Sequence, residues 1–397
     1  MSVHGRAKSA YMSLGDRLRN NALMDAKWLV EQEVDTWKGW VDLPVRRRLW
    51  LWRHGFTSPC GVLYDFDTYG PEAYISELER HRLFRAINGD HRYLVDDKLS
   101  QHWMLADHPE HRPTAFGLVD GGAVHGLAGT AFDGDPVPVP EWLPSTLRRE
   151  SRLVLKQLRG GGGSEVHLCE SDDEGGFLLD GEPVRERELV AAFEDLAGYL
   201  VSAFVHQHEY ADALYPHATN TLRVVTLWDD ANDRLRVPAA VQRIGTADSR
   251  PVDNFSSGGL SAGVDVETGE LSAAVRHPGV SERLWHDRHP DTGAPIAGER
   301  VPQWDAVRET IVRIARDHTA FPLLGWDVVV DETGTPVVIE ANTGTDVDLI
   351  QAHGPLLEDP DVAAVVSRYL PEVDRPSVPS RSRERTVQSD GRQIRRH

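Results

Sequence analysis

The sequence has little cysteine: its 397 residues include only Cys60 and Cys169. Two isolated thiols provide neither a disulfide framework nor a CxxC metal pair, which argues against a disulfide-rich or zinc-binding protein. The sequence also lacks a run of about 18 apolar residues, as a membrane-spanning helix would require. Its first residues lack the apolar core of a signal peptide. We therefore expect a cytoplasmic protein without a membrane span.

Lysine is also scarce, since only five of the 43 basic residues are lysines. Acidic residues number 62, and the resulting formal net charge of −19 disfavours nonspecific nucleic-acid binding by the body of the protein. Such a composition resembles that of salt-adapted proteins, although a GC-rich genome would also favour arginine. Against this background Lys98 and Lys156 stand out, because each lies inside a patterned segment.

The residues that are present indicate a soluble globular protein, with 40% hydrophobic and 26% charged residues. Its length suits two or three domains. Apolar residues at three- and four-residue spacing predict helices within 15–53, 71–106 and 301–318. Short apolar runs joined by polar turns predict strands, with an antiparallel sheet in the second half of the chain. The segment 131–144 is rich in Pro, Gly and Asp and predicts an exposed loop.

After Leu370 the composition changes, because the remaining residues are rich in Arg, Ser and Pro and almost devoid of apolar side chains. This pattern predicts a disordered basic tail. Such a tail either has no role or makes a charge-mediated contact with an anionic surface.

The most informative stretch is GWDVVVDETGTPVVIEAN, residues 325–342, in which two apolar runs flank a Thr-Gly pair. The pattern predicts a β-hairpin. If the Thr-Gly pair is a two-residue loop, Asp327 lies opposite Glu340, and strand alternation puts Asn342 on the same face as Glu340. Hard oxygen ligands in this arrangement suit Mg²⁺, with Mn²⁺ as the alternative ion. Scattered, solvated acids are the other interpretation, and a one-residue slip would move one carboxylate to the opposite face.

A glycine-rich segment follows the predicted strand 152–158, in which Lys156 lies within an apolar run. A lysine in such a run needs an anion. The next residues are Arg159 and four consecutive glycines, whose backbone N–H groups could approach phosphate oxygens. The run matches neither the P-loop nor GxGxxG, and a glycine run alone is more often a flexible turn. The neighbouring lysine and arginine favour phosphate binding.

Two further segments carry candidate anion ligands. Alternation places Thr221 and Arg223 on one face of a strand, where Arg223 could hold a phosphate, a substrate carboxylate or a structural acid partner. Arg243 lies on the following strand, and the small-residue turn 253–259 is either an anion-binding nest or an ordinary loop. The 18 histidines show no zinc spacing, and the sequence contains no GxSxG motif.

Together these stretches resemble the ATP-grasp superfamily, and most closely its sugar-transfer-associated branch. The matching segments occur in consistent order over about residues 95–352 and include DKL, LVLKQLRGGGGSEV, NTLRVVT, DNFSSGGL and GWD…EAN. The motifs are weak singly and specific as a set. The resemblance implies an α+β fold in which two α+β subdomains with antiparallel sheets grip ATP. It predicts a mainly helical region (1–90), a first subdomain with a lid loop (91–205), a second with the metal site (206–371) and the basic tail (372–397).

The resemblance also implies roles for individual residues. The implied nucleotide-binding residues are Lys98, Lys156, Arg159, Gly160, Gly161, Gly162, Gly163, Ser202, Phe204, Val205 and His208, the catalytic residues are Arg223, Arg243 and Asn254, and the Mg²⁺ ligands are Asp327, Glu340 and Asn342. Many relatives have a glutamate near the adenine strand, where this chain has Ser202 and Ala203, so backbone groups would have to read the base. Since both lysines and the metal triad are present, an inactive pseudoenzyme is not expected.

The implied reaction is an ATP- and Mg²⁺-dependent, ADP-forming ligation. A substrate carboxylate is converted into an acyl phosphate, which an amine or a similar nucleophile then attacks. The association with sugar transfer implies a sugar-linked carboxylate in cell-surface polysaccharide or glycoconjugate biosynthesis. The alternatives are an ATP-grasp kinase that phosphorylates a small molecule or sugar, and a non-catalytic ATP-binding module. A nucleic-acid binder is disfavoured by the acidic body.

Overall fold

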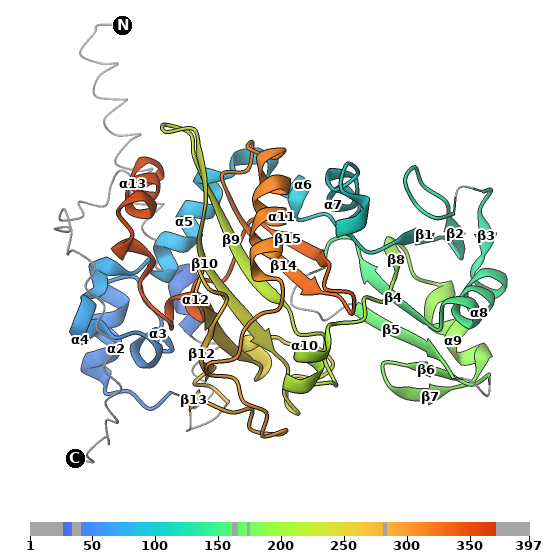
Figure 1. The fold of residues 1–397 in the computed structure, drawn as a ribbon, viewed down its shortest axis with the longest axis horizontal. Coiled ribbons are helices and arrows are strands. Elements are labelled where there is room, and N and C mark those ends of the chain that lie inside the picture. Colours follow the sequence, from blue (N-terminus) through green and yellow to red (C-terminus); the bar gives the residue numbers. More distant parts are fainter. Residues whose placement is uncertain are drawn as a thin grey trace, which may run out of the picture.

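The computed structural model describes residues 27–33, 41–132, 134–160, 166–172, 175–280 and 284–370. Within these residues, the helices of residues 45–69, the antiparallel sheet of residues 222–342 and the antiparallel sheet of residues 115–203 lie in a row, in this order (Figure 1). The predicted loop residues Gly161, Gly162 and Gly163, the basic tail and part of the predicted helical segment 15–53 lie outside the described residues.

Short helices occupy the region before the first sheet, as predicted for 71–106. They are α2 (Val45–Arg53), α3 (Cys60–Leu63), α4 (Phe66–Tyr69), α5 (Glu77–Ile87), α6 (Arg92–Val95) and α7 (Lys98–Met104), with 3₁₀ turns η1 (Pro71–Ala73), η2 (Gly89–His91) and η3 (Pro109–His111). A capping box of Ser76 and Glu79 starts α5, and the Asp97 side chain caps α7. None of the helices in the described part of the chain combines the length and apolar character that a bilayer crossing requires.

The first sheet has the strand order β3-β2-β1-β8-β4-β5-β6-β7. Its strands are β1 (Ala115–Asp120), β2 (Ala123–His125), β3 (Val137–Pro138), β4 (Arg152–Gln157), β5 (Val166–Ser171), β6 (Phe177–Leu179), β7 (Glu182–Val184) and β8 (Tyr199–Ala203), and its helices are α8 (Val139–Glu150) and α9 (Glu186–Glu194). Leu153 and Leu155 are buried in a core with both helices, so alternation turns Lys156 to the other face.

The prediction of an exposed loop over 131–144 is wrong in its second half. The helix α8 begins at Val139 in spite of two prolines, because Trp142 and Leu143 pack into the core of the first sheet. Pro140 is tolerated in the first turn, where its missing N–H has no helical partner.

The second sheet has the order β13-β12-β11-β10-β9-β14-β15. Its strands are β9 (Leu222–Asp229), β10 (Arg234–Ile244), β11 (Leu260–Val264), β12 (Leu271–Arg276), β13 (Trp285–His286), β14 (Leu323–Val330) and β15 (Pro336–Asn342), and the remaining elements are α10 (Glu209–Leu214), η4 (Phe255–Ser257), α11 (Trp304–Arg316), α12 (Asp348–Gln351), η5 (Leu356–Glu358) and α13 (Pro360–Tyr369). The predicted antiparallel sheet in the second half of the chain is confirmed.

The two faces of the second sheet have different cores. One face packs on α11, with Val224 and Trp326 against Ile311. The other face carries Val225 and packs on the N-terminal helices and α12 and α13. Arg223, Asp327 and Val225 share this second face by alternation, so the helical region covers the same sheet face that carries the predicted catalytic residues. This packing makes the N-terminal helices a wall of the site.

In the hairpin β14–β15, Asp327 lies opposite Glu340 as predicted, but the turn is not the predicted two-residue loop. The loop is one residue longer, since Asp331 N–H donates to Thr335 O and Gly334 adopts a positive φ of 87°. This shifts the register so that Val330 lies opposite Pro336, and a bulge next to Asp327 then restores the pairing of Asp327 with Glu340. The predicted pairing is confirmed, although through two local irregularities that cancel.

Candidate active site

A cleft of about 680 Å³ lies between the two sheets and brings most of the predicted site residues together. Its walls come from β4, β5 and β8 of the first sheet, from β9, β10, β14 and β15 of the second, and from α5. The predicted residues that line it are Lys98, Lys156, Gly160, Ser202, Phe204, Val205, Arg223, Arg243, Asn254, Asp327, Glu340 and Asn342.

Two predicted nucleotide ligands do not line this cleft. His208 is the N-cap of α10: its ring Nδ1 accepts from the Tyr210 N–H at 3.2 Å, and its backbone N–H donates to Val330 O at 2.8 Å. Arg159 is largely exposed, pairs with Asp97 at 3.2 Å and lines an adjoining hollow. The sequence does not distinguish a histidine that caps a helix from one that contacts adenine, because either can follow a strand, as His208 does.

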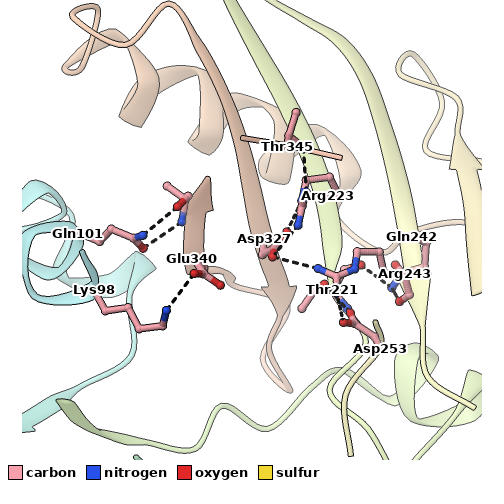
Figure 2. Close-up of polar contacts among 11 residues, drawn as sticks. Lys98, Gln101, Thr221, Arg223, Gln242, Arg243, Asp253, Asp327, Glu340 and Thr345 are labelled. Atoms are coloured by element: carbon pink, nitrogen blue, oxygen red, sulfur yellow. Dashed lines mark hydrogen bonds and ion pairs between the residues drawn. The ribbon is translucent and has the colours of Figure 1, made fainter. Parts of the chain in front are cut away.

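The strand order explains why Asp327 is the centre of the site. Because β14 lies between β9 and β15, Asp327 is opposite Arg223 on one side and opposite Glu340 on the other. The Arg223 guanidinium donates to both Asp327 oxygens, at 2.5 and 3.1 Å, and Arg243 donates to one of them at 3.0 Å (Figure 2). Burial by itself would raise the pKa of the Asp327 carboxyl, but the two guanidinium groups outweigh it and hold this pKa below its ordinary value.

Each arginine has a second anchor. Arg223 donates to the Thr345 hydroxyl at 2.8 Å, and the absent side chain of Gly325 leaves room for it, because a Cβ there would lie 3.1 Å from Arg223 Cδ. Arg243 pairs with Asp253 at 2.6 Å (Figure 2). Of the interpretations that the sequence left open for Arg223, the structure shows the acid partner, in a position that still lines the cleft.

Asp253 lies in the small-residue turn, and both oxygens of its carboxylate contact other residues of the protein. One oxygen accepts from Arg243, and the other accepts from the backbone N–H and the hydroxyl of Thr221, at 2.8 and 2.5 Å. Its neighbour Asn254 lines the cleft. The turn therefore orients Arg243, whose Nε–H is buried and has no partner among the described residues.

On the opposite side of the cleft, α7 brings Lys98 to Glu340. The Gln101 side chain donates to Ala341 O at 2.8 Å and accepts from Ala341 N–H at 3.0 Å, so it pairs with the free edge of β15 (Figure 2). One turn earlier, Lys98 Nζ lies 3.1 Å from Glu340 Oε1 and 3.0 Å from Gly160 O. Lys98 thus connects the hairpin acid to the first residue of the glycine run.

Lys156 is a buried cation of the cleft without an acid partner in the described chain. It forms no ion pair within the described part of the chain, and burial lowers the pKa of its ammonium, although Glu340 and Asp327 partly oppose this effect. An amine held this way gains most from an anionic ligand, as the sequence pattern predicted for a phosphate.

A divalent cation fits part of the predicted triad. The Asn342 Nδ2 is buried without a partner in the described chain, so the amide is free to turn its oxygen to a ligand, and Glu340 has one oxygen not engaged by Lys98. Asp327 already accepts three N–H groups of about four that a carboxylate can accept. Glu340 and Asn342 therefore fit Mg²⁺ better than Asp327, and no group of three His, Cys, Asp or Glu in the described residues forms a metal cluster.

The sequence did not predict the wall of the cleft that α5, the start of α6 and the loop after β15 form. Arg80, Phe84, Arg85, Arg92 and Asp346 all line the cleft. The four-residue spacing of Arg80 and Phe84 on a helical pattern was the available signal. It could not show that this helix face meets the catalytic sheet.

Next to this wall lies a cluster of acidic residues, Glu77, Asp346 and Asp348, of which Glu77 is buried. Arg80 pairs with Glu77 at 2.9 Å and with Asp346 at 3.2 Å. Burial, together with the nearby Asp346 and Glu77 charges, raises the pKa of Asp348 from 3.8 to about 7. Arg80 opposes this effect but cannot balance three acids.

We expect Asp348→Asn to stabilise the protein increasingly as pH rises from about 4 to about 8. A carboxyl with a raised folded pKa holds its proton more tightly in the folded state, so wild-type stability is lost as pH rises from 3.8 through about 7. The amide can keep the bond to the Leu349 N–H. Urea unfolding across this pH range measures the difference. A gain that does not change with pH would contradict the raised pKa.

The fold and the cleft define the class of protein, and the sequence comparison gives the family. The model of the family described as sugar-transfer associated ATP-grasp matches residues 78–358, and the chain belongs to this family. The predicted family and α+β fold class are thereby confirmed. ATP-grasp enzymes use ATP and divalent metal ions. A search of curated protein sequences found no match.

Several solved structures are distantly similar. They include the ATP-grasp ligase PsnB with its minimal precursor (12% identity, 72% of this chain, 64% of that chain, TM-score 0.37), an N5-carboxyaminoimidazole synthase from Aspergillus clavatus (12%, 63%, 44%, 0.34) and an L-amino acid ligase from Bacillus licheniformis (12%, 63%, 41%, 0.32). In each case the match spans less than two thirds of the other protein's length.

Proposed function

We propose that the protein is an ATP- and Mg²⁺-dependent, ADP-forming ligase that joins a carboxylate to an amine or a similar nucleophile. The observation that carries the proposal is that four cations line one cleft: Lys98, Lys156, Arg223 and Arg243. The same cleft holds a Glu340 oxygen not engaged by Lys98 and the Asn342 amide, whose Nδ2 has no partner in the described chain, as possible metal ligands. Four cationic side chains from four elements match the charge of a triphosphate and an acyl phosphate. Family membership supports the use of ATP.

The positions of the residues suggest which part of the nucleotide each of them would bind. Lys98 and Lys156 would hold the α- and β-phosphates, and the loop that begins at Gly160 would close over them. Ser202, Phe204 and Val205 would hold adenine and ribose through backbone groups and apolar contact. In this division the nucleotide lies along the first sheet, and its γ-phosphate reaches the arginines of the second.

Arg223 and Arg243 would then stabilise the γ-phosphate and the acyl-phosphate oxygens, with Asn254 on the acceptor side. Asp327 fixes both guanidinium groups, which keeps them in place before the charge develops. When bound, Mg²⁺ would supply Lewis-acid neutralisation of phosphate oxygens, held by Glu340 and Asn342 with waters and phosphate as further ligands.

The chemistry consists of two displacements. A substrate carboxylate oxygen attacks the γ-phosphorus, the bond to the bridging oxygen breaks, and ADP leaves. The amine nitrogen then attacks the acyl carbon, phosphate leaves with the C–O bond electrons, and the amine loses a proton. The protein contributes position and charge to both steps, so no covalent nucleophile is required.

The family description supports a carboxylate carried by a sugar, such as a uronic acid, in the biosynthesis of surface polysaccharides or glycoconjugates. The test is Mg²⁺-dependent release of ADP and phosphate in molar salt, with a panel of uronic acids and amino acids. We expect release that requires both a carboxylate and an amine. A stable phosphorylated product without amine would identify a kinase, and ATP binding without turnover on any substrate would identify a binding module.

A further inference from the structure

Most of the lysines and arginines that line the cleft have either an acid partner or a role in the proposed function. Arg80, Lys98, Arg223 and Arg243 each have an acid partner within hydrogen-bond distance. Lys156 is accounted for by the nucleotide in the proposed function. Arg85 and Arg92 have neither, because they form no ion pair within the described residues and the proposed function gives them no role.

These two arginines lie on a wall that is fixed to the catalytic sheet. Asn88, at the end of α5, donates to Leu323 O at 2.8 Å and accepts from Leu323 N–H at 3.2 Å. Asp96, at the end of α6, accepts from the Thr343 hydroxyl at 2.8 Å. Arg85 and Arg92 are thus held by elements that connect directly to β14 and to the loop after β15.

Their lack of acid partners is notable in a chain with a net charge of −19. Some exposed arginines elsewhere have one, since Arg148 pairs with Glu186, Arg185 with Glu188, and Arg300 with Glu270, whereas others, such as Arg316, form no ion pair within the described residues. What distinguishes Arg85 and Arg92 is that they line the cleft. Within the described chain Arg92 donates only to the carbonyl of Gly89, at 3.2 Å, and the Arg85 side chain has no hydrogen bond. Guanidinium groups left unbalanced in a cleft match a carboxylate or phosphate ligand.

The charge of the ligand follows from the reaction, and this step rests on the proposed function. The reacting carboxylate loses its negative charge when it becomes an acyl phosphate, so guanidinium groups kept for that carboxylate would stabilise only the starting state. A group that stays anionic throughout is bound equally well before and after. We propose that Arg85 and Arg92 bind a second anionic group of the carboxylate substrate, either a phosphate or a further carboxylate.

The proposal is tested by calorimetric titration with sugar acids, with and without a non-hydrolysable Mg²⁺–ATP analogue. Glucuronic acid 1-phosphate carries a second anion as a phosphate, galactaric acid carries it as a carboxylate, and glucuronic acid lacks it. We expect at least one doubly charged probe to bind about tenfold more tightly than glucuronic acid. The preferred probe identifies the kind of anion.

The variants Arg85→Gln and Arg92→Gln should each bind the preferred doubly charged probe about tenfold more weakly, which removes its advantage over glucuronic acid. Their affinity for the nucleotide analogue should be unchanged. Arg316→Gln, which removes the same charge from an exposed site outside the cleft, is the matched control and should keep the preference. Unchanged urea midpoints will show that the variants are folded. Equal binding of all probes, or a loss of nucleotide affinity in the two variants, would overturn the proposal. A wild-type protein that binds the probes but no nucleotide would refute the ligase function alone.

Discussion

Asp327→Asn is expected to lower the free energy of unfolding by about 3–5 kcal/mol, the usual effect of leaving a buried charge without its partner. Arg223 and Arg243 are only 6% and 8% exposed, and both donate to the Asp327 carboxylate. The amide keeps the shape of the side chain but cannot balance two guanidinium groups. Arg243 retains Asp253, so most of the loss should arise at Arg223. Urea unfolding followed by tryptophan fluorescence measures the change.

The matched control is Asp305→Asn, which breaks an ion pair with Arg308 at 3.5 Å on a largely exposed surface. Exposed pairs of this kind contribute about 0–1 kcal/mol. If Asp327→Asn destabilises no more than this control, the two arginines do not depend on Asp327. That result would contradict the positioning role and favour Asp327 as a metal ligand, as the sequence predicts.

Lys156→Met is expected to reduce ATP-dependent turnover by about 10²–10³-fold, the range for removal of one hydrogen-bond donor to the charge that develops in a transition state. Stability should not fall and should rise slightly, because the substitution removes a desolvated ammonium that has no ion-pair partner in the described chain. Steady-state ADP release and urea unfolding measure the two quantities. A loss of both activity and stability would show that Lys156 supports the fold rather than the nucleotide.

The comparison with Lys98→Met makes this test sharper. Lys98 pairs with Glu340 at 3.1 Å, so its replacement should also lower activity but should reduce stability rather than raise it.

The pH dependence of the stability change adds a second check on Lys156. Burial lowers the folded pKa of Lys156, so its penalty is present below that pKa and disappears above the unfolded value of 10.5. The stability gained by Lys156→Met should shrink as pH rises toward this value.

The sequence by itself determined the family and the chemical inventory of the site. Two lysines in a chain with five, a glycine run after a strand, and acids inside apolar runs are local patterns that need no tertiary contact to be read. Alternation correctly turned Lys156 away from Leu155 and placed Thr221 on the same face as Arg223. These rules work because they depend on the geometry of a single strand.

The pairing of Asp327 with Glu340 shows the limit of such rules. A two-residue turn predicted it, but the structure reaches it through a longer turn and a compensating bulge. Loop length and bulges depend on what the hairpin packs against, which the hairpin sequence does not contain. The correct pairing was therefore less secure than the pattern suggested.

Tertiary structure alone decided which charges meet. Arg223 and Arg243 reach Asp327 across 104 and 84 residues of sequence, and Arg80 reaches Asp346 across 266. The strand order of the second sheet creates the first set of contacts, and the packing of the N-terminal helices on the same sheet face creates the last. No periodicity encodes these encounters, because they depend on how separate elements pack. The sequence thus supplied the charged groups of the site, and the fold decided which of them neutralise one another and which remain for a ligand.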